Sequence, residues 1–406
     1  MSDLSRMTAT TRTVSTINQS AIIRALRDHG PLSRARIGQL TGLSPATVNR
    51  LTSLMAKQRL IVQDGQEPST GGRPSLILRY TGGPRVVSSL HLRGDRVVGG
   101  LVDFDGKLIE RRELRFDDEA RNGAGNGTGG GDVDHRLELI GELLAGLLEQ
   151  AEEQGTPCLS VGISVPGVVA EPEGRIGPLP ELGWPGLPLR EFLRSRTDLP
   201  LVIENDANAL AYGEYRRGAG VGTSSMVAVL LDNGMGAGII TKGALHRGRH
   251  FEAGEIGYLL MERSSLRRSY KELGDLEDRV GSAALTRSAR ARGLRGGDGA
   301  LLTAHDIVEL ARADNPVARE MVDEIVDMIS MAVAALSVIL DPEVIVVGSG
   351  ITSGTDEIIP GIQSRLTGRI LRVPTLVPSS LGEDAVLLGA AELAMGEVDQ
   401  VDFVPR

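Results

Sequence analysis

The stretch from Leu201 to Glu214, LVIENDANALAYGE, determines how the body of this chain can fold. Leu201–Ile203 is a short apolar strand, and it runs directly into polar residues that begin a helix over Ala207–Arg216. Other buried strands that end in a turn rich in glycine or proline are predicted at 160–169, 227–231 and 344–347. Strands that alternate with helices in this way predict an α/β domain with a ligand cleft at the strand ends.

The first sixty residues predict three helices with sharp boundaries. The first ends at His29-Gly30-Pro31, the second follows Ser33 and ends at the turn around Gly42, and the third follows Ser44. Pro45 takes the first position of the third helix, where a missing N–H costs nothing. The apolar residues predicted to hold these helices together are Ile22, Ala25, Leu26, Ile37, Leu40, Val48, Leu51, Leu54 and Met55.

This arrangement predicts a helix-turn-helix followed by a wing. Strands at 61–62 and 76–80 form a hairpin around a polar, glycine-rich tip at 64–74, and Arg73 in that tip suits a narrow minor groove. The residues predicted to contact DNA are Ser33, Arg34, Ser44, Ala46, Thr47, Asn49, Arg50 and Arg73. A helical dimerisation domain with an unrelated loop is the alternative.

The charge distribution favours DNA. Although the net charge is -9, residues 1–80 hold 11 Lys and Arg against 4 Asp and Glu, a balance of +7. The remaining residues hold 33 against 49, a balance of -16. A basic module for phosphates is therefore joined to an acidic body that phosphates would repel.

Composition excludes several other classes. The 406 residues are too many for one ordinary domain, and no apolar run approaches the roughly 20 residues that cross a bilayer, so a soluble, cytoplasmic protein is expected. The single cysteine, Cys158, excludes an intramolecular disulfide and any multi-cysteine zinc site, and its apolar context predicts a buried thiol. No cofactor is expected.

Between the two modules, residues 86–116 alternate apolar and polar side chains, which predicts a meander of strands. Residues 117–135 (DDEARNGAGNGTGGGDVDH) have too few apolar groups to bury, so a flexible surface loop without function is expected there. Long helices are predicted at 137–153 and 317–340.

Taken together, these motifs resemble the ROK family of repressors, open reading frames and sugar kinases, in its regulator branch. The resemblance spans nearly the whole chain and rests on 44–51 with 71–74, 161–168, 204–214, 234–238, 252–257 and 341–350. It implies two actin-like (ribonuclease H-like) lobes that close on a sugar, in a homodimer or homotetramer. The expected domains are a winged helix-turn-helix at 1–82, a first lobe at 83–203, and a second lobe at 204–406 that returns to the first at its C-terminal end.

The chain departs from the kinases of this family at the phosphate loop. Those kinases carry Asp-x-Gly-Gly-Thr, whereas this chain has His91-Leu92-Arg93-Gly94-Asp95. Arg93 brings bulk and Asp95 brings negative charge where a polyphosphate would approach, so no ATP binding and no enzyme activity are expected. The family's zinc site is also altered: Tyr258 stands at its histidine, and 270–277 contains no cysteine, so no metal is expected.

The resemblance implies sugar contacts at Asn205, Asp206, Glu255, Tyr258 and Glu277. Carboxylates and amides suit the hydroxyls of a sugar, and Asp206 is the position of the general base in a kinase. The alternative is structural: Asn205 and Asp206 would only cap the following helix, and the glutamates would pair with arginines.

These observations predict a DNA-binding regulator, of the repressor type, for carbohydrate metabolism genes, with operator DNA and a sugar or sugar phosphate as partners. Two alternatives remain: a sugar kinase with an added DNA-binding domain, and a regulator that senses a protein partner through a vestigial pocket.

Overall fold

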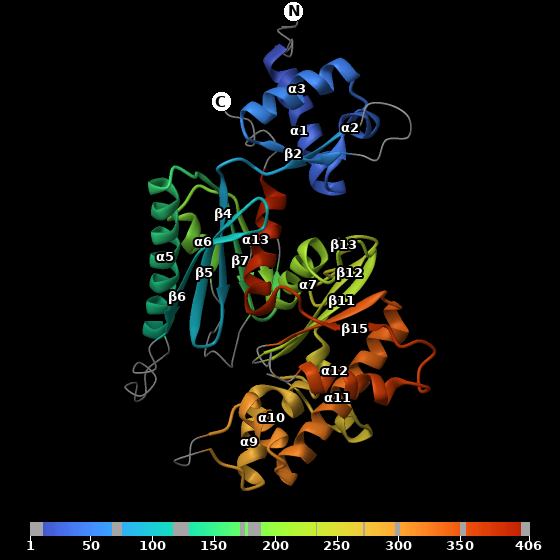
Figure 1. The fold of residues 1–406 in the computed structure, drawn as a ribbon. Helices are drawn as coiled ribbons and strands as arrows, with labels where there is room; N and C mark the ends of the chain where they lie inside the picture. Colours follow the sequence, from blue (N-terminus) through green and yellow to red (C-terminus); the bar gives the residue numbers. More distant parts are fainter. Residues whose placement is uncertain are drawn as a thin grey trace, which may run out of the picture.

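The computed structural model describes residues 11–66, 75–116, 130–170, 175–177, 188–232, 234–270, 273–296, 301–349 and 355–398. It consists of a small N-terminal domain above two larger lobes, each built on a five-stranded sheet (Figure 1). The division at residues 82 and 203 stays a prediction.

The N-terminal domain has three helices and a small sheet in the order β1-β3-β2. The second and third helices begin as expected, because the hydroxyls of Ser33 and Ser44 accept hydrogen bonds from the amides of Arg36 and Thr47. Gly42 ends the second helix with φ 71°, a conformation that favours glycine. The elements are α1 (Thr11–His29), β1 (Leu32–Ser33), α2 (Arg34–Thr41), α3 (Pro45–Lys57), β2 (Ile61–Gln66) and β3 (Leu76–Tyr80).

Two of the nine predicted core residues of this domain are wrong. Leu40 and Leu54 are 37% and 38% exposed, whereas the other seven are buried. Both lie at the edge of the apolar stripe of their helices, where helical spacing alone does not separate inside from outside. The wing strand β2 extends to Gln66, and the rest of the predicted tip, including Arg73, lies outside the described residues.

The first lobe contains a sheet in the order β10-β7-β4-β5-β6. Its β4 is buried along its whole length, so the predicted alternation over 86–116 is wrong there. The reason is that α5 and α13 both pack against β4, on the two faces of the sheet. On the neighbouring β5, adding a side-chain carbon to Gly99 would meet Leu143 and Leu147 of α5, and adding one to Gly100 would meet Leu387 of α13. The elements are β4 (Val86–Leu92), β5 (Arg96–Asp103), β6 (Leu108–Arg115), α5 (Gly130–Glu153), β7 (Cys158–Val165), β8 (Val169–Ala170), β9 (Arg175–Ile176), α6 (Leu189–Arg194) and β10 (Leu201–Asn205).

The loop expected at 117–135 is wrong for residues 130–135, which belong to a helix. Residues 117–129 lie outside the described residues, and α5 already begins at Gly130. Val133 packs against the core of the lobe, and the buried Arg136 lies 5.3 Å from the ring of Phe116. These contacts stabilise the first turns of α5, although glycine residues in that segment disfavour a helix. Cys158, expected to be buried, is half-buried.

The second lobe contains a sheet in the order β13-β12-β11-β14-β15, with helices on both faces. Helices α11 and α12 pack on one face and α7 on the other (Figure 1). The elements are α7 (Asp206–Arg217), β11 (Ser225–Leu231), β12 (Met235–Thr241), β13 (Ala244–Leu245), the 3-10 helices Ile256–Tyr258 and Arg263–Arg267, α8 (Glu277–Val280), α9 (Ser282–Ala291), α10 (Ala304–Arg312), α11 (Pro316–Leu340), β14 (Val344–Ser349), α12 (Thr355–Leu366), β15 (Thr375–Pro378), the 3-10 helix Gly382–Asp384 and α13 (Ala385–Glu397).

Helices α7 and α13 pack against each other between the two sheets and so join the lobes (Figure 1). Their backbones approach so closely that a side-chain carbon on Gly389 would lie 1.8 Å from the carbonyl oxygen of Ala209. The far end of α13 enters the hydrophobic cluster of the N-terminal domain through Ala391, Ala394 and Met395. One rigid pair of helices therefore contacts all three parts of the molecule.

Candidate functional site

The N-terminal end of α3 presents an open surface. Ala46, Asn49 and Arg50 are exposed there, and the half-buried Thr47 has its hydroxyl 2.9 Å from that of Ser44. The exposed residues lie on the side of the helix opposite the buried Val48, Leu51 and Met55. This is the placement that a recognition helix requires.

Ser33 and Arg34, which are also predicted to contact DNA, have structural partners. Ser33 is buried and its hydroxyl caps α2, while Nε of Arg34 donates a hydrogen bond to the hydroxyl of Thr52 at 2.9 Å. Arg34 thereby connects α2 to α3.

Asn205 and Asp206 lie at the junction of β10 and α7. Oδ1 of Asn205 accepts the amide of Asn208 at 3.1 Å and caps the helix, and its Nδ2 donates to the carbonyl of Gly167 at 3.0 Å. Oδ1 of Asp206 accepts the amide of Ala207, within the first turn of α7, at 2.8 Å. The structural role expected as the alternative therefore applies to Asn205 more than to Asp206.

A group of carboxylates surrounds Asp206. Burial, together with the negative charges of Asp232 and Glu255, raises the pKa of Asp206 to about 7. Burial also raises the pKa of Glu255 to about 7, with Glu277 contributing. The structure thus brings together residues that are distant in sequence.

Glu277 and Tyr258 complete this group. An oxygen of Glu277 accepts a hydrogen bond from the amide of Met235 at 3.3 Å. The carboxylate therefore lies directly against the glycine-rich turn that begins at Gly234 and leads into β12. Burial raises the pKa of Tyr258, and the charges of Glu277 and Glu255 add to this effect, although the ring is 47% exposed. Its position at the rim suits contact with a ligand that enters from solvent.

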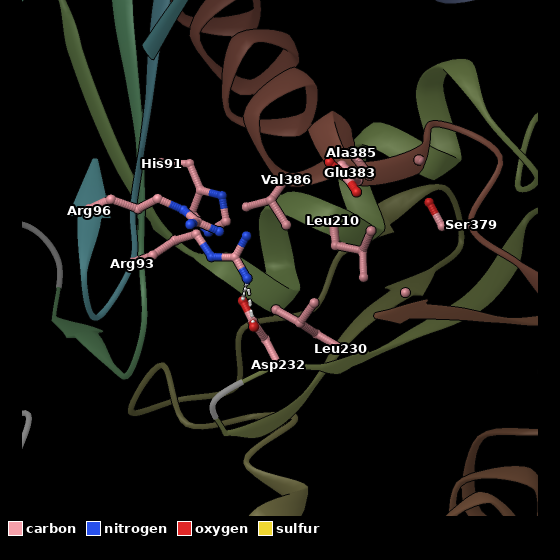
Figure 2. A pocket seen from close by; sticks show the side chains of 12 residues that line it. His91, Arg93, Arg96, Leu210, Leu230, Asp232, Ser379, Glu383, Ala385 and Val386 are labelled. Atoms are coloured by element: carbon pink, nitrogen blue, oxygen red, sulfur yellow. Dashed lines mark hydrogen bonds and ion pairs between the residues drawn. The ribbon is translucent and has the colours of Figure 1, made fainter. Parts of the chain in front are cut away.

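At the predicted phosphate position, the two lobes are joined by an ion pair. One nitrogen of Arg93, on the hairpin between β4 and β5, donates to both oxygens of Asp232 at 2.7 Å (Figure 2). Asp232 directly follows β11, next to the glycine-rich turn. Sequence reasoning missed Asp232, although its place at a strand end beside those glycines was a usable signal.

A small cavity lies beside this ion pair. Its volume is about 140 Å³, and its lining includes His91, Arg93, Arg96 and Asp232 (Figure 2). Pockets for drug-sized ligands have volumes of roughly 300–1,000 Å³, so the cavity is too small for a nucleotide. Burial lowers the pKa of His91 to about 3, with Arg93 and Arg96 contributing, so its imidazole is neutral.

The region of the family's zinc site is held together by hydrogen bonds. Asp275 accepts bonds from the hydroxyls of Ser265 and Tyr270 at 2.6 Å and from Nε of Arg279 at 3.0 Å. Burial would raise the pKa of Asp275, but these bonds together hold it well below its usual range. Across the described ranges, no group of three or more His, Cys, Asp or Glu side chains could hold a metal ion.

The comparisons with known proteins agree with this architecture. The chain belongs to the ROK family, because residues 133–397 match the sequence pattern of that family. Residues 20–65 match the IclR helix-turn-helix domain. These matches confirm the resemblance and the fold class expected from the sequence.

Individual relatives include regulators and kinases. A putative xylose repressor of Caldicellulosiruptor sp. is 28% identical, over 82% of this chain and 83% of the relative. A ROK family transcriptional regulator, a homologue of the Escherichia coli MLC protein, has the same fold with a TM-score of 0.73, 22% identity, and coverage of 96% and 98%. A ROK family glucokinase of Streptomyces griseus, solved with glucose and AMPPNP, has a TM-score of 0.62, 29% identity, and coverage of 77% and 99%.

In the part of the chain that the structure describes, no helix is both long enough and apolar enough to span a bilayer.

Proposed function

We propose that this chain is a DNA-binding transcription regulator, of the repressor type, for carbohydrate metabolism genes. A sugar or sugar phosphate binds between the lobes and changes the affinity for operator DNA. The regulator acts as a homodimer or homotetramer, so that two winged helices read a palindromic site. Ala46, Asn49 and Arg50 meet base edges, and Arg73 reaches the adjacent minor groove.

Helix α7 is the observation that carries this proposal. Asp206, which belongs to the cluster of acidic residues, lies in the first turn of this helix, and Arg216 and Arg217 lie in its last turn. Its 12 residues span roughly 18 Å. A single rigid element therefore connects the candidate sugar site with the DNA-binding domain.

The contacts at the end of α7 support this connection. A guanidinium nitrogen of Arg216 donates to the carbonyl oxygen of Arg27, in the last turn of α1, at 3.1 Å. Arg217 donates to Glu392 of α13 at 2.6 Å and to the carbonyl oxygen of Phe104 at 2.9 Å. A sugar that draws the lobes together shifts α7 against the first lobe and thereby turns α1. Such a sugar regulates DNA binding only if it has different affinities for the two conformations.

Loss of kinase activity is the second part of the proposal. The Arg93–Asp232 ion pair lies where the kinases of the family have their phosphate loop, and the cavity of about 140 Å³ beside it leaves no room for a nucleotide. Asp206 then holds a sugar hydroxyl without activating it for attack.

The test uses an operator selected from random-sequence DNA with the full-length protein. Its affinity is measured by fluorescence anisotropy with and without each of a panel of sugars and sugar phosphates. One ligand is expected to change the affinity at least fivefold in the wild type, but not in the Asp206→Asn variant. The matched control is Asp323→Asn, which removes an exposed carboxylate that pairs with Arg365 at 3.1 Å, and it is expected to respond as the wild type does.

Three outcomes would contradict the proposal. An Asp206→Asn variant that responds fully would remove the sugar site from this position. Sugar-dependent turnover of ATP would make the protein a kinase. No response to any sugar or sugar phosphate would favour a regulator that senses a protein partner.

A further inference from the structure

The Arg93–Asp232 ion pair bears on which class of sugar can enter the cleft. Arg93 comes from the first lobe and Asp232 from the second, and both side chains are about one-fifth exposed (21% and 20%). The pair lines the small cavity together with Leu210 of α7, which stands one helical turn after Asp206 (Figure 2). Any group on the sugar that points toward the former phosphate position must meet this pair.

Asp232 places negative charge beside Asp206. Its effect on the titration of Asp206 is the largest after burial, and Glu255 acts in the same direction. A phosphate ester on a hydroxyl held by Asp206 would bring a charge of about -1.5 to -2 into the space between these carboxylates. The interaction would be repulsive in a partly desolvated site, where charges are poorly screened.

Two arginines of the two lobes already bind carboxylates. Arg93 holds Asp232, and Nε of Arg247 donates to Glu204 at 2.7 Å, immediately before Asn205. A phosphate that drew Arg93 away from Asp232 would leave this carboxylate half-buried without its partner. Hydroxyl groups have no such conflict, because they donate hydrogen bonds to carboxylates.

We propose that the effector is an unphosphorylated sugar, and that Asp232, held by Arg93, is the residue that rejects phosphate esters. This inference rests on the proposed sugar site and narrows its ligand. Asp232 acts as a specificity determinant through charge, since Asp206, Glu255 and Glu277 supply the hydrogen-bond acceptors for the sugar itself.

The test measures the dissociation constants of free pentoses and hexoses, and of their terminal phosphate esters, by isothermal titration calorimetry on the full-length protein. The wild type is expected to bind one free sugar at least tenfold more tightly than its ester. Asp232→Asn keeps the shape of the side chain, removes the charge and frees Arg93, so the preference is expected to shrink at least tenfold. Asp323→Asn, which removes the same charge from an exposed Arg–Asp pair between α11 and α12, is expected to keep the wild-type preference.

The readout is a ratio within each variant, so a general loss of stability cancels. An ester that binds as tightly as the free sugar in the wild type would overturn the inference while leaving the sugar site intact. An unchanged ratio in Asp232→Asn would remove Asp232 from this role. No binding of either class would overturn the proposed function, and the inference with it.

Discussion

Replacing Glu392 by glutamine is expected to destabilise the junction between the lobes and the DNA-binding domain. Glu392 is 3% exposed, and it accepts a hydrogen bond from Nε of Arg217 at 2.6 Å while Nε of Arg216 lies 3.8 Å away. Its charge also stabilises the positive charge of Arg27, whose pKa is lowered by burial. The substitution keeps the shape of the side chain and removes the negative charge that Glu392 provides to these three arginines.

The expected cost follows from the exposure of the partners. Removing one member of a fully buried ion pair costs about 3–5 kcal/mol. Arg216 and Arg217 are 25% and 33% exposed and can turn partly toward water, so we expect the lower end, about 3 kcal/mol. The free energy of unfolding is measured by urea denaturation followed by far-UV circular dichroism.

A matched control separates burial from charge. Glu309→Gln breaks an ion pair with Arg312 of the same length, 2.6 Å, on the surface of α10, where the carboxylate is 48% exposed. That change is expected to cost less than about 0.5 kcal/mol. If Glu392→Gln cost no more than Glu309→Gln, the reasoning that makes Glu392 the centre of this junction would be refuted.

Three further predictions concern the sites and the helix packing. Because the pKa of Asp206 is raised to about 7 by burial, from 3.8, the folded state holds an extra proton, and stability falls as the pH rises from about 4 to about 7. Asp206→Asn is expected to remove up to about 4 kcal/mol of this dependence, as measured by urea midpoints over that range, and an unchanged slope would contradict the assignment. Ser44→Ala removes the cap of α3 and is expected to cost about 1 kcal/mol and to weaken operator binding; equal melting temperatures for variant and wild type would speak against it. Gly389→Ala is expected to lower the free energy of unfolding by at least about 1–3 kcal/mol, because its new carbon would meet the carbonyl of Ala209. Gly396→Ala, on the same helix with open space around it, is expected to be neutral or stabilising by up to about 1 kcal/mol. Equal effects of the two substitutions would contradict the close packing of α7 and α13.

Local features of this protein were predictable from the sequence, because short-range physics determines them. Ser44 followed by Pro45 begins α3, and Gly42 ends α2, since capping bonds and positive φ angles depend on neighbouring residues alone. The same reasoning failed for Leu40 and Leu54, which lie on the edges of helical stripes. It also failed for β4, whose second face is covered by a helix that comes from the other end of the chain.

The candidate sugar site was predictable only through the resemblance to a family. Nothing local in Asp206, Glu255 or Glu277 indicates that they meet, because 49 residues separate the first two in the chain and 22 the last two. Asp232 was missed, since its significance comes from Arg93, which lies 139 residues away on the opposite lobe.

The sequence by itself determined the elements, the basic N-terminal module and the chemical types of the candidate ligands. Only the tertiary structure decided which carboxylates share one space, which arginines neutralise them, and that α7 extends from that space to the DNA-binding domain. The physical reason is that charge interactions and packing depend on distance in space and not on separation along the chain. Arg93 and Asp232, for example, are in contact although 139 residues separate them in the sequence.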